Sequence, residues 1–249
     1  MDIIKYKKKA NGQYQVQLDN GTDLCLYEDV ILRYELLLKH KIASTEMEEI
    51  LQANMEYDVY YVGLKSLKSR YKTVKELKEY LVKKEYPLDF IDKAVERLIQ
   101  QGYLNDVSFA KAYINQQIIT TNKGPLKIRQ ELLHKGVSSK IIEEELAVFL
   151  PEMQHEKIQK VALRLVKTNR SRGGNVLRQK IMNDLVTLGY DSSFITTDLA
   201  NITFSDTSEI AKKEYDKLYR RLSRKYSGKE LEYKIREKLY QKGLKYEDC

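Results

Sequence analysis

The segment NKGPLKIRQELLHKGV, from Asn122 to Val137, recurs three more times along the chain in altered form. Its relatives are YKTVKELKEYLVKKEYPL from Tyr71, RGGNVLRQKIMNDLVTLGY from Arg172 and SGKELEYKIREKLYQKGL from Ser227. Each copy has apolar residues at helical spacing, and three of the four end at a glycine followed by an apolar residue. A helix of about 12 residues is unstable alone in water, so the recurrence predicts repeated units that bury one another's apolar faces.

The units are predicted to contain three short helices each and to recur about every 50 residues. The period is visible in Gly124, Gly174 and Gly228, which precede the second helix of successive units. Copies three and four run about one helical turn longer between their glycines than copy two. The fourth unit lacks a segment for a third helix and is expected to act as an end cap.

The first 43 residues predict a different structure. Strands are expected over about residues 2–9, 13–19 and 23–27, with hairpins of type I′ at Asn11-Gly12 and Asn20-Gly21. A helix that starts with Asp29 as its N-cap is expected to cover one face of this sheet. Further on, Thr45 and Glu48 have the spacing of a capping box.

The predicted fold class is mainly α, with tandem three-helix repeats in an elongated, curved stack behind a small antiparallel β-meander. The predicted domains are 1–43 for the meander and its helix, 44–105 for a linker helix and the first repeat, 106–153 for the second repeat, 154–205 for the third, and 206–249 for a truncated fourth.

The composition favours a basic helical protein of the cytoplasm. The 249 residues hold 44 Lys and Arg against 36 Asp and Glu, a net charge of +8, and only 3 prolines. The excess of positive charge indicates a polyanionic partner, or else an ordinary solvated surface. Cys25 and Cys249 have no ligand spacing, which suits a reducing compartment, and we find no stretch typical of a signal peptide or a membrane span.

The motifs do not predict an enzyme. His40, His134 and His155 are isolated in sequence, and the glycine-rich RGGN from Arg172 lacks the spacing of a phosphate-binding loop. The carboxylates of IEEEL point in different directions on a helix and read as a solvated face. We therefore expect no catalytic residue, no cofactor and no metal, and an enzyme would need a site assembled from dispersed residues.

Positive charge is concentrated at similar places of the later repeats. Arg221, Arg224 and Lys225 are expected to share one helix face. Tyr219 and Tyr226 lie close to these cations in the sequence and are candidates for stacking on bases. Successive clusters favour an extended track for a polyanion over plain surface. The candidates for contact with DNA or its protein filament are Lys123, Lys127, Arg129, Lys167, Arg170, Arg172, Arg178, Arg221, Arg224 and Lys225.

The central segment resembles the RecX family, whose members regulate the bacterial RecA recombinase. The resemblance lies in GYLND and FAKAYI over Gly102–Ile114 and in GPLKIRQELLHKGV over Gly124–Val137. It extends over nearly the whole chain, although Gly124-Pro125 has no equivalent in the later copies and Glu85 stands where a glycine is common. The motif residues, which look mainly structural, are Gly102, Tyr103, Leu104, Asp106, Phe109, Ala110, Tyr113, Gly124, Pro125, Ile128, Leu132 and Gly136.

The resemblance implies a non-enzymatic regulator that binds RecA filaments on single-stranded DNA. It implies inhibition or disassembly of the filament, a place in DNA repair, recombination and the SOS response, and a monomeric cytoplasmic protein. A general single-strand nucleic-acid-binding repeat protein is the alternative, and a hydrolase or transferase with dispersed residues is a third class.

Overall fold

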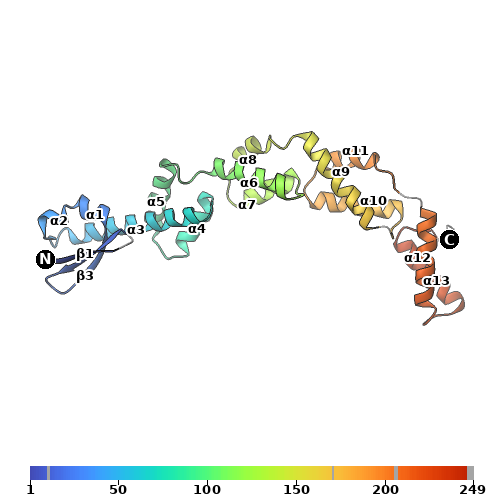
Figure 1. Ribbon diagram of the computed structural model, residues 1–249, viewed down its shortest axis with the longest axis horizontal. Coiled ribbons are helices and arrows are strands. Elements are labelled where there is room, and N and C mark those ends of the chain that lie inside the picture. Colours follow the sequence, from blue (N-terminus) through green and yellow to red (C-terminus); the bar gives the residue numbers. More distant parts are fainter. Residues whose placement is uncertain (10–11, 170, 205–206, 246–249) are drawn as a thin grey trace. The chain divides into compact units, whose positions relative to one another are not determined.

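The computed structural model of the chain describes residues 1–9, 12–169, 171–204 and 207–245. These residues form two compact units, Met1–Ala110 with His134–Ile141, and Lys111–Leu133 with Ile142–Cys249. The border between the units falls inside all three helices of the second predicted repeat. The predicted fold class is confirmed, because the described chain is mainly helical and its helical repeats follow one three-stranded sheet (Figure 1).

The sheet is the predicted antiparallel meander of β1 (Ile3–Lys8), β2 (Gln13–Leu18) and β3 (Asp23–Tyr27). The turn between β2 and β3 is not the expected type I′. Only Gly21 has a positive φ, of 84°, whereas Asn20 does not, and the Gly21 N–H donates to the Leu18 carbonyl while Leu18 pairs with Thr22. This is a three-residue loop in which glycine alone occupies the left-handed position. Asn11, of the other expected turn, lies outside the described residues.

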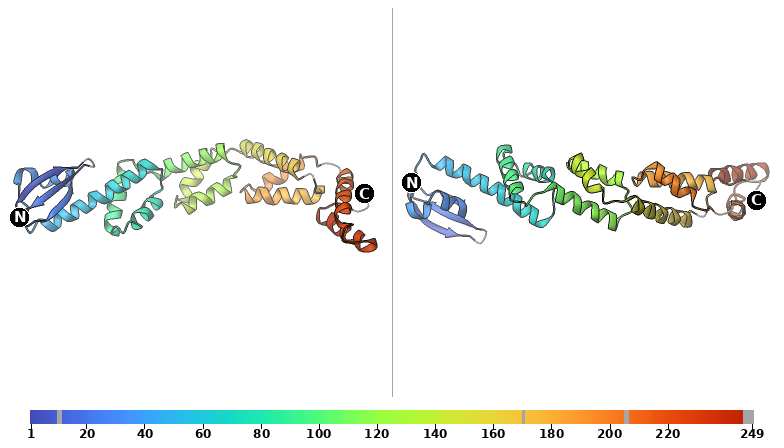
Figure 2. Two further views of the ribbon diagram at one scale, coloured as in Figure 1. Left: turned by 60° about the horizontal axis from the view of Figure 1, so that its bottom comes forward. Right: turned by 90° about the horizontal axis from the view of Figure 1, so that it is seen from above.

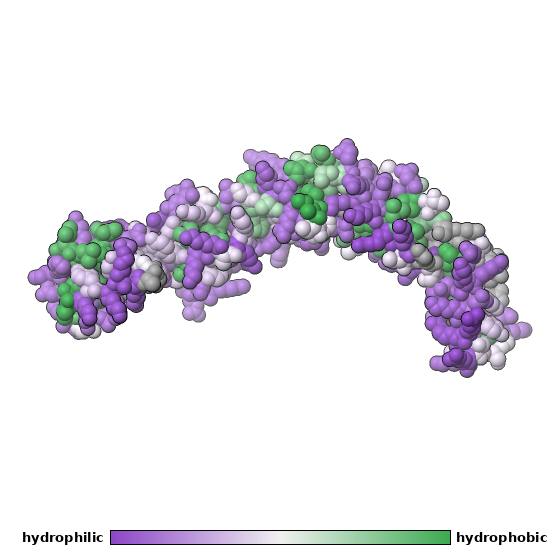
Figure 3. Space-filling view, in the orientation of Figure 1, coloured by the Kyte–Doolittle hydropathy of each residue, from purple (hydrophilic) through white to green (hydrophobic). Residues whose placement is uncertain are grey.

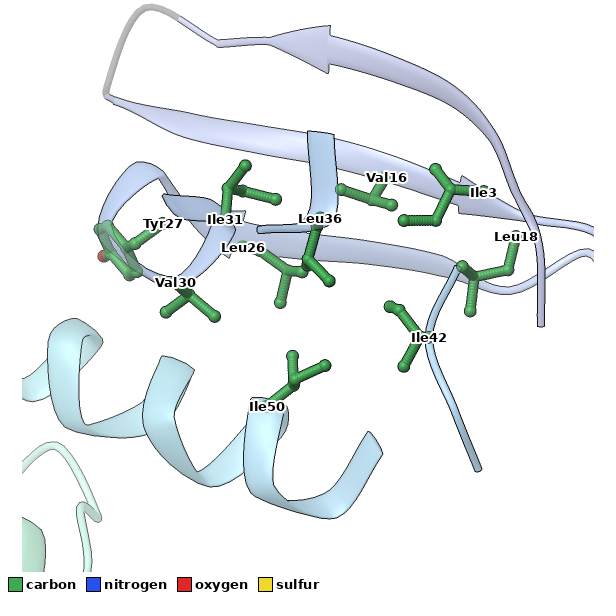
Figure 4. Packing of buried hydrophobic residues seen from close by; sticks show 10 residues of the cluster. All are labelled: Ile3, Val16, Leu18, Leu26, Tyr27, Val30, Ile31, Leu36, Ile42 and Ile50. Carbon is green, nitrogen blue, oxygen red and sulfur yellow. The ribbon is translucent and has the colours of Figure 1, made fainter. Parts of the chain in front are cut away.

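One face of the sheet is buried by the segments that follow it (Figure 4). Val16, Leu18 and Leu26 are fully buried, and they pack with Ile31 and Ile50 from two helices. The opposite face carries Gln13, Gln15 and Gln17. Alternation along β2 therefore places its apolar residues on one side, as the sequence predicts.

The helix expected from Asp29 is broken in two. It forms α1 (Glu28–Arg33) and α2 (Leu36–Lys39), with Glu35 between them at a φ of 51°. The N-cap is Tyr27 and makes no side-chain cap hydrogen bond, so the expected Asp29 cap is wrong. The Asp29 carboxylate instead accepts a hydrogen bond from the Tyr61 hydroxyl at 2.7 Å.

A single helix of 23 residues, α3 (Met47–Ser69), takes the place of both the expected linker helix and the expected first helix of the first repeat. It begins after Glu46, so the capping box of Thr45 and Glu48 does not form. The N-terminal half packs on the sheet (Figure 2), and the C-terminal half is the first helix of the first repeat. Asp58, midway along it, accepts hydrogen bonds from Tyr27 at 2.7 Å and Tyr86 at 2.6 Å, which ties the meander to that repeat.

The remaining helices follow in groups. The first repeat adds α4 (Val74–Val82) and α5 (Leu88–Gln100), and the second has α6 (Asp106–Thr120), α7 (Pro125–His134) and α8 (Ser139–Leu146). The third has α9 (Pro151–Thr168), α10 (Gly174–Thr187) and α11 (Ser192–Ala200), and the fourth has α12 (Thr207–Leu222) and α13 (Gly228–Gln241). The recurring helix has 10 residues in α7 and 14 in α10 and α13, which confirms the extra turn. The domain boundaries themselves stay a prediction.

A recurring joint connects each repeat to the next one. The start of the second helix in one repeat touches the C-terminal turn of the second helix in the following repeat. The Gly124 N–H donates to the Leu188 carbonyl at 2.7 Å, and the Gly173 N–H donates to the Lys242 carbonyl at 2.7 Å. In the first joint the Thr73 hydroxyl takes this role and donates to the Lys135 carbonyl at 2.6 Å.

Glycine is required at these joints because the backbones are in contact. A Cβ on Gly124 would come within 2.4 Å of the Gly189 carbonyl oxygen, and one on Gly189 within 2.3 Å of the Lys127 nitrogen. Beside them, the buried Tyr190 donates to the Asn122 carbonyl at 3.2 Å. Burial raises the pKa of Tyr190 to about 12, so its hydroxyl stays a hydrogen-bond donor at neutral pH.

The two ends of the repeat series depart from this pattern. Glu85, in the turn after α4, has a φ of 64° and takes the place that Gly136, Gly189 and Gly243 hold in later repeats. The first repeat has no earlier repeat to contact, so a side chain is accommodated there. Ser227 likewise precedes α13 where Gly124 and Gly173 precede α7 and α10.

Candidate polyanion-binding surface

The strongest concentration of positive charge lies on α12. Between Lys212 and Lys229 the chain has eight lysines and arginines and only two acids, Glu214 and Asp216. Ala211, Leu218 and the half-buried Leu222 form the face of α12 that packs on α13. Figure 3 shows a hydrophilic surface over these two helices.

The opposite face of α12 holds a shallow groove of about 470 Å³. Lys213, Lys217 and Arg220 follow one another at intervals of four and three residues, which aligns them along one side of α12, and Arg224 continues the row in the turn after the helix. The residues that line the groove are Lys213, Asp216, Lys217, Arg220, Arg221 and Arg224.

Most of this charge is not neutralised within the protein. Lys213 pairs with Glu209 at 3.1 Å, but both side chains are more than 70% exposed, where such a pair contributes little. The buried Glu214 is bound by Lys242 and lies 3.9 Å from Lys217. Among the residues that the structure describes, no ion pair involves Arg220, Arg221 or Arg224. The groove therefore presents a net positive surface to solvent.

Helix α12 ends at Leu222, which alters the expected arrangement of Arg221, Arg224 and Lys225. Arg224 and Lys225 lie in the turn that follows, where the Lys225 N–H donates to the Leu222 carbonyl at 2.9 Å. Arg221 and Arg224 both line the groove, but Lys225 does not. The expectation of one shared helix face is thus wrong, because the helix stops before both Arg224 and Lys225, although Arg224 still lines the same groove as Arg221.

Three residues that line the groove, Lys213, Lys217 and Arg220, are not among the candidates predicted from the sequence. Their signal was the cationic stripe at 213, 217, 220 and 224, which the spacing of a helix places on one face. Of the two expected stacking tyrosines, Tyr219 is 48% exposed and Tyr226 is half-buried against the core of α12 and α13. Tyr219 also stacks on Tyr215, with ring centroids 6.1 Å apart.

The candidates of the third repeat lie around the loop between α9 and α10. Lys167 and Arg172 line a cleft of about 680 Å³, in which Glu209 and Glu214 of α12 supply negative charge. Arg178 is exposed on α10. No ion pair holds these three cations within the described part of the chain, and Arg170 lies outside it.

Two of the three candidates in the second repeat, Lys123 and Arg129, are engaged with carboxylates. Lys123 bonds Glu131 at 2.7 Å with both side chains about three-quarters buried, and Arg129 bonds Glu143 at 2.6 Å. Burial tends to raise the pKa of the Glu131 carboxyl, but hydrogen bonds from Lys123 and Tyr113 and the nearby Lys127 hold it below its ordinary value. The structure therefore gives Lys123 and Arg129 carboxylate partners, in contrast to Arg220, Arg221 and Arg224 of the α12 groove.

The described residues contain no group of three or more His, Cys, Asp or Glu side chains placed to hold a metal ion. His155 Nδ1 lies 2.8 Å from Asp198 Oδ2, and Gln159 donates to the other carboxylate oxygen of Asp198 at 3.2 Å. Asp198 is 2% exposed, so this network satisfies a buried carboxylate between α9 and α11. No helix of the described chain is long and apolar enough to cross a membrane.

The fold defines a tandem three-helix repeat protein with an N-terminal β-meander. Family models for RecX match at residues 60–98, as its first three-helix domain, and at residues 105–146, as its second. The regulatory protein RecX of Listeria monocytogenes serotype 4a is 31% identical over 98% of this chain and 92% of its own length, and that of Streptococcus agalactiae serotype III is 32% identical over 100% and 96%. The chain therefore belongs to the RecX family of regulatory proteins.

Solved structures agree with this assignment. A crystal structure of regulatory protein RecX, 28% identical, covers 79% of this chain and 98% of its own with a TM-score of 0.70. The crystal structure of RecX from Lactobacillus salivarius, 26% identical, covers 59% of this chain and 96% of its own with a TM-score of 0.57.

Proposed function

We propose that this protein binds filaments of RecA recombinase on single-stranded DNA and lowers their recombination and damage-response activities without catalysing a reaction itself. Membership of a family named for regulation supports the regulatory part. The observation that carries the binding part is the α12 groove, where Arg220, Arg221 and Arg224 have no carboxylate partner among the described residues. A row of unpaired cations suits the phosphates of a nucleic-acid strand or an acidic protein surface.

The candidate residues fall into two groups under this proposal. Those of α12 and its following turn, with Lys167, Arg172 and Arg178 of the third repeat, are available for a partner. Lys123 and Arg129 would have to leave Glu131 and Glu143 first. We therefore propose that the third and fourth repeats hold the principal polyanion contacts.

The decisive experiment measures RecA-catalysed strand exchange and ATP hydrolysis while the protein is added well below one molecule per RecA subunit. Inhibition at these amounts is the expected result, because a filament regulator acts without covering the DNA. Inhibition only at amounts that coat the strand would contradict the proposal and favour a general single-strand nucleic-acid-binding protein. Chemical turnover by the protein alone would contradict the non-enzymatic part.

A control separates charge from mere crowding of the DNA. The variant with Arg221→Glu and Arg224→Glu removes two groove cations that the fold does not use. It should fold normally and inhibit RecA only at higher amounts. Unchanged inhibition would place the contact elsewhere on the protein.

A further inference from the structure

Helix α13 exposes two tyrosine rings on the side turned away from its core. Leu231, Ile235 and Leu239 are buried against α12. Tyr233 and Tyr240 are 65% and 82% exposed, and they are seven residues apart, which places them on the same face two turns from each other. Two exposed rings on one helix face, next to the most basic stretch of the chain, offer a surface on which bases can stack.

Positive charges lie on the same face as the two rings. Lys229 is four residues before Tyr233, and Arg236 lies between the rings, three residues after Tyr233 and four before Tyr240. Both residues are exposed. Glu237 next to Arg236 is paired with Lys234 at 3.4 Å, and the Lys234 ammonium also lies 5.7 Å from the centre of the Tyr233 ring. The face therefore alternates cation, ring, cation and ring.

The spacing of the rings determines what they can contact together. Seven residues of helix span about 10.5 Å along the axis. A single base is too small to lie on both rings, so each ring is available to a separate base of one strand. Lys229 lies one turn before Tyr233, where it can reach a phosphate beside the first of these bases.

We propose that this face of α13 binds single-stranded nucleic acid by stacking unpaired bases on Tyr233 and Tyr240, with the exposed Lys229 on a phosphate. The inference rests on the proposed function, and it assigns the preference for single strands to named residues. Bases of a duplex are stacked on each other and do not offer a free face. The rings would thus discriminate a single strand from a duplex, whereas the cations of α12 attract both.

Nucleic acid fits this face better than an apolar protein surface does. The most basic stretch of the chain, from Lys212 to Lys229, leads directly into α13. The groove of about 470 Å³ on α12 belongs to the same two-helix packing unit. An apolar partner would gain nothing from this charge, but a strand of phosphates and bases complements both the cations and the rings.

The test compares the full-length protein with its Tyr233→Ala and Tyr240→Ala variants in binding to an oligothymidylate. Each substitution should weaken binding about 5-fold to 100-fold, the range found when one stacking aromatic is removed. The dependence of affinity on salt should stay the same, because no phosphate contact is lost. Binding to an abasic strand of the same length and to a duplex should not change.

Two controls make the result specific to the rings. Tyr233→Phe and Tyr240→Phe keep the stacking surface and should bind the oligothymidylate like the parent protein. Tyr71→Ala removes a ring that is 79% exposed before α4 and should also leave binding unchanged. Circular dichroism establishes that each variant is folded.

Other outcomes overturn this inference without overturning the proposed function. If the alanine variants bind oligothymidylate like the parent but lose inhibition of RecA, the face docks a protein surface. If both properties are unchanged, the rings have no part in binding, and the regulatory function is then carried elsewhere. Equal losses toward the abasic strand and the duplex would show that the rings do not act by stacking.

Discussion

Gly173 and Gly243 are in backbone contact, although 70 residues separate them in the sequence. A Cβ on Gly173 would come within 1.9 Å of the Gly243 carbonyl oxygen, and the Gly173 N–H donates to the carbonyl of Lys242 at 2.7 Å. A Cβ on the neighbouring Gly174 would have its nearest contact, the Phe204 Cβ, at 3.8 Å. Two adjacent glycines thus have very different structural roles.

The first prediction follows from this difference. Gly173→Ala should destabilise the joint between α10 and α13 by about 1–3 kcal/mol, as overpacked sites do. Gly174→Ala is the matched control and should cost less, because ordinary van der Waals contact accommodates its methyl group. Amide hydrogen exchange measures the effect, and we expect faster exchange in α12 and α13 with α4 and α5 unchanged. Equal behaviour of the two variants would contradict the joint.

The second prediction concerns the core of the second repeat. Leu132 is fully buried on α7, whereas Leu133 beside it is 39% exposed. Leu132→Ala should lower the free energy of unfolding by about 2–5 kcal/mol, and Leu133→Ala by clearly less. Chemical denaturation of both variants decides the point. If Leu132→Ala has the same free energy of unfolding as the wild type, the buried face of α7 is wrongly identified.

The third prediction tests the α12 groove through its salt dependence. Each phosphate contact on a single strand adds about 0.7 to the slope of log affinity against log salt. The double variant Arg221→Glu and Arg224→Glu should therefore flatten the slope by about 1.4 if each arginine holds one phosphate. Its effect on stability should stay below about 0.5 kcal/mol, because both residues are on the surface.

A charge-matched control belongs with this experiment. Lys83→Glu and Lys84→Glu changes the net charge equally but alters exposed residues after α4. It should leave the slope almost unchanged. A weaker affinity of the groove variant with the slope unaltered would mean that its arginines act through structure and not through phosphate contact.

The fourth prediction concerns pH. The pKa of Glu131 is below its ordinary value of 4.5 in the folded protein, despite burial, because of Lys123 and Tyr113. A carboxyl with a lowered folded-state pKa stabilises the fold fully above the unfolded-state value, and this contribution disappears as pH falls through the folded-state value. Glu131→Gln should thus be less stable than wild type at pH 7, and the difference should shrink below about pH 4.5. Denaturant unfolding at several pH values measures it, and a constant difference would contradict the role of this carboxylate.

The fifth prediction concerns the elongated stack that the repeat pattern suggests. A compact chain of this length would have a radius of gyration of about 18 Å. We expect the monomer to exceed this value clearly in small-angle scattering. A radius near the compact value would contradict the expected arrangement of the repeats.

Much of the architecture could be predicted because it depends on local patterns. The alternation of Tyr14, Val16 and Leu18 with glutamines marked β2, and the spacing of Ile128 and Leu132 marked the buried side of α7. The recurring glycines marked the repeats. Their physical reason, contact between backbones far apart in sequence, was visible only in three dimensions.

The errors arose where tertiary packing or helix length overrode local signals. Thr45 and Glu48 have capping-box spacing, yet α3 begins after Glu46. The helix continues through Asp58, whose carboxylate accepts hydrogen bonds from Tyr27 and Tyr86. Lys123 and Arg129 looked available as cations because Glu143 lies in the next helix and Glu131 two turns away. Sequence spacing locates charge on a helix, but it does not reveal which charges the fold itself neutralises.

The direction of the joints has a consequence for how such a chain can change in length. Each internal repeat offers the start of its second helix to the repeat after it and the end of that helix to the repeat before it. Glu85 and Ser227 stand in place of glycine at the first and the last of these positions in the described chain. A duplicated internal repeat would therefore satisfy both of its neighbours without any alteration of the terminal ones. We therefore expect the joints to tolerate the insertion or removal of a whole unit, whereas a fragment of a unit would leave a joint without its glycine.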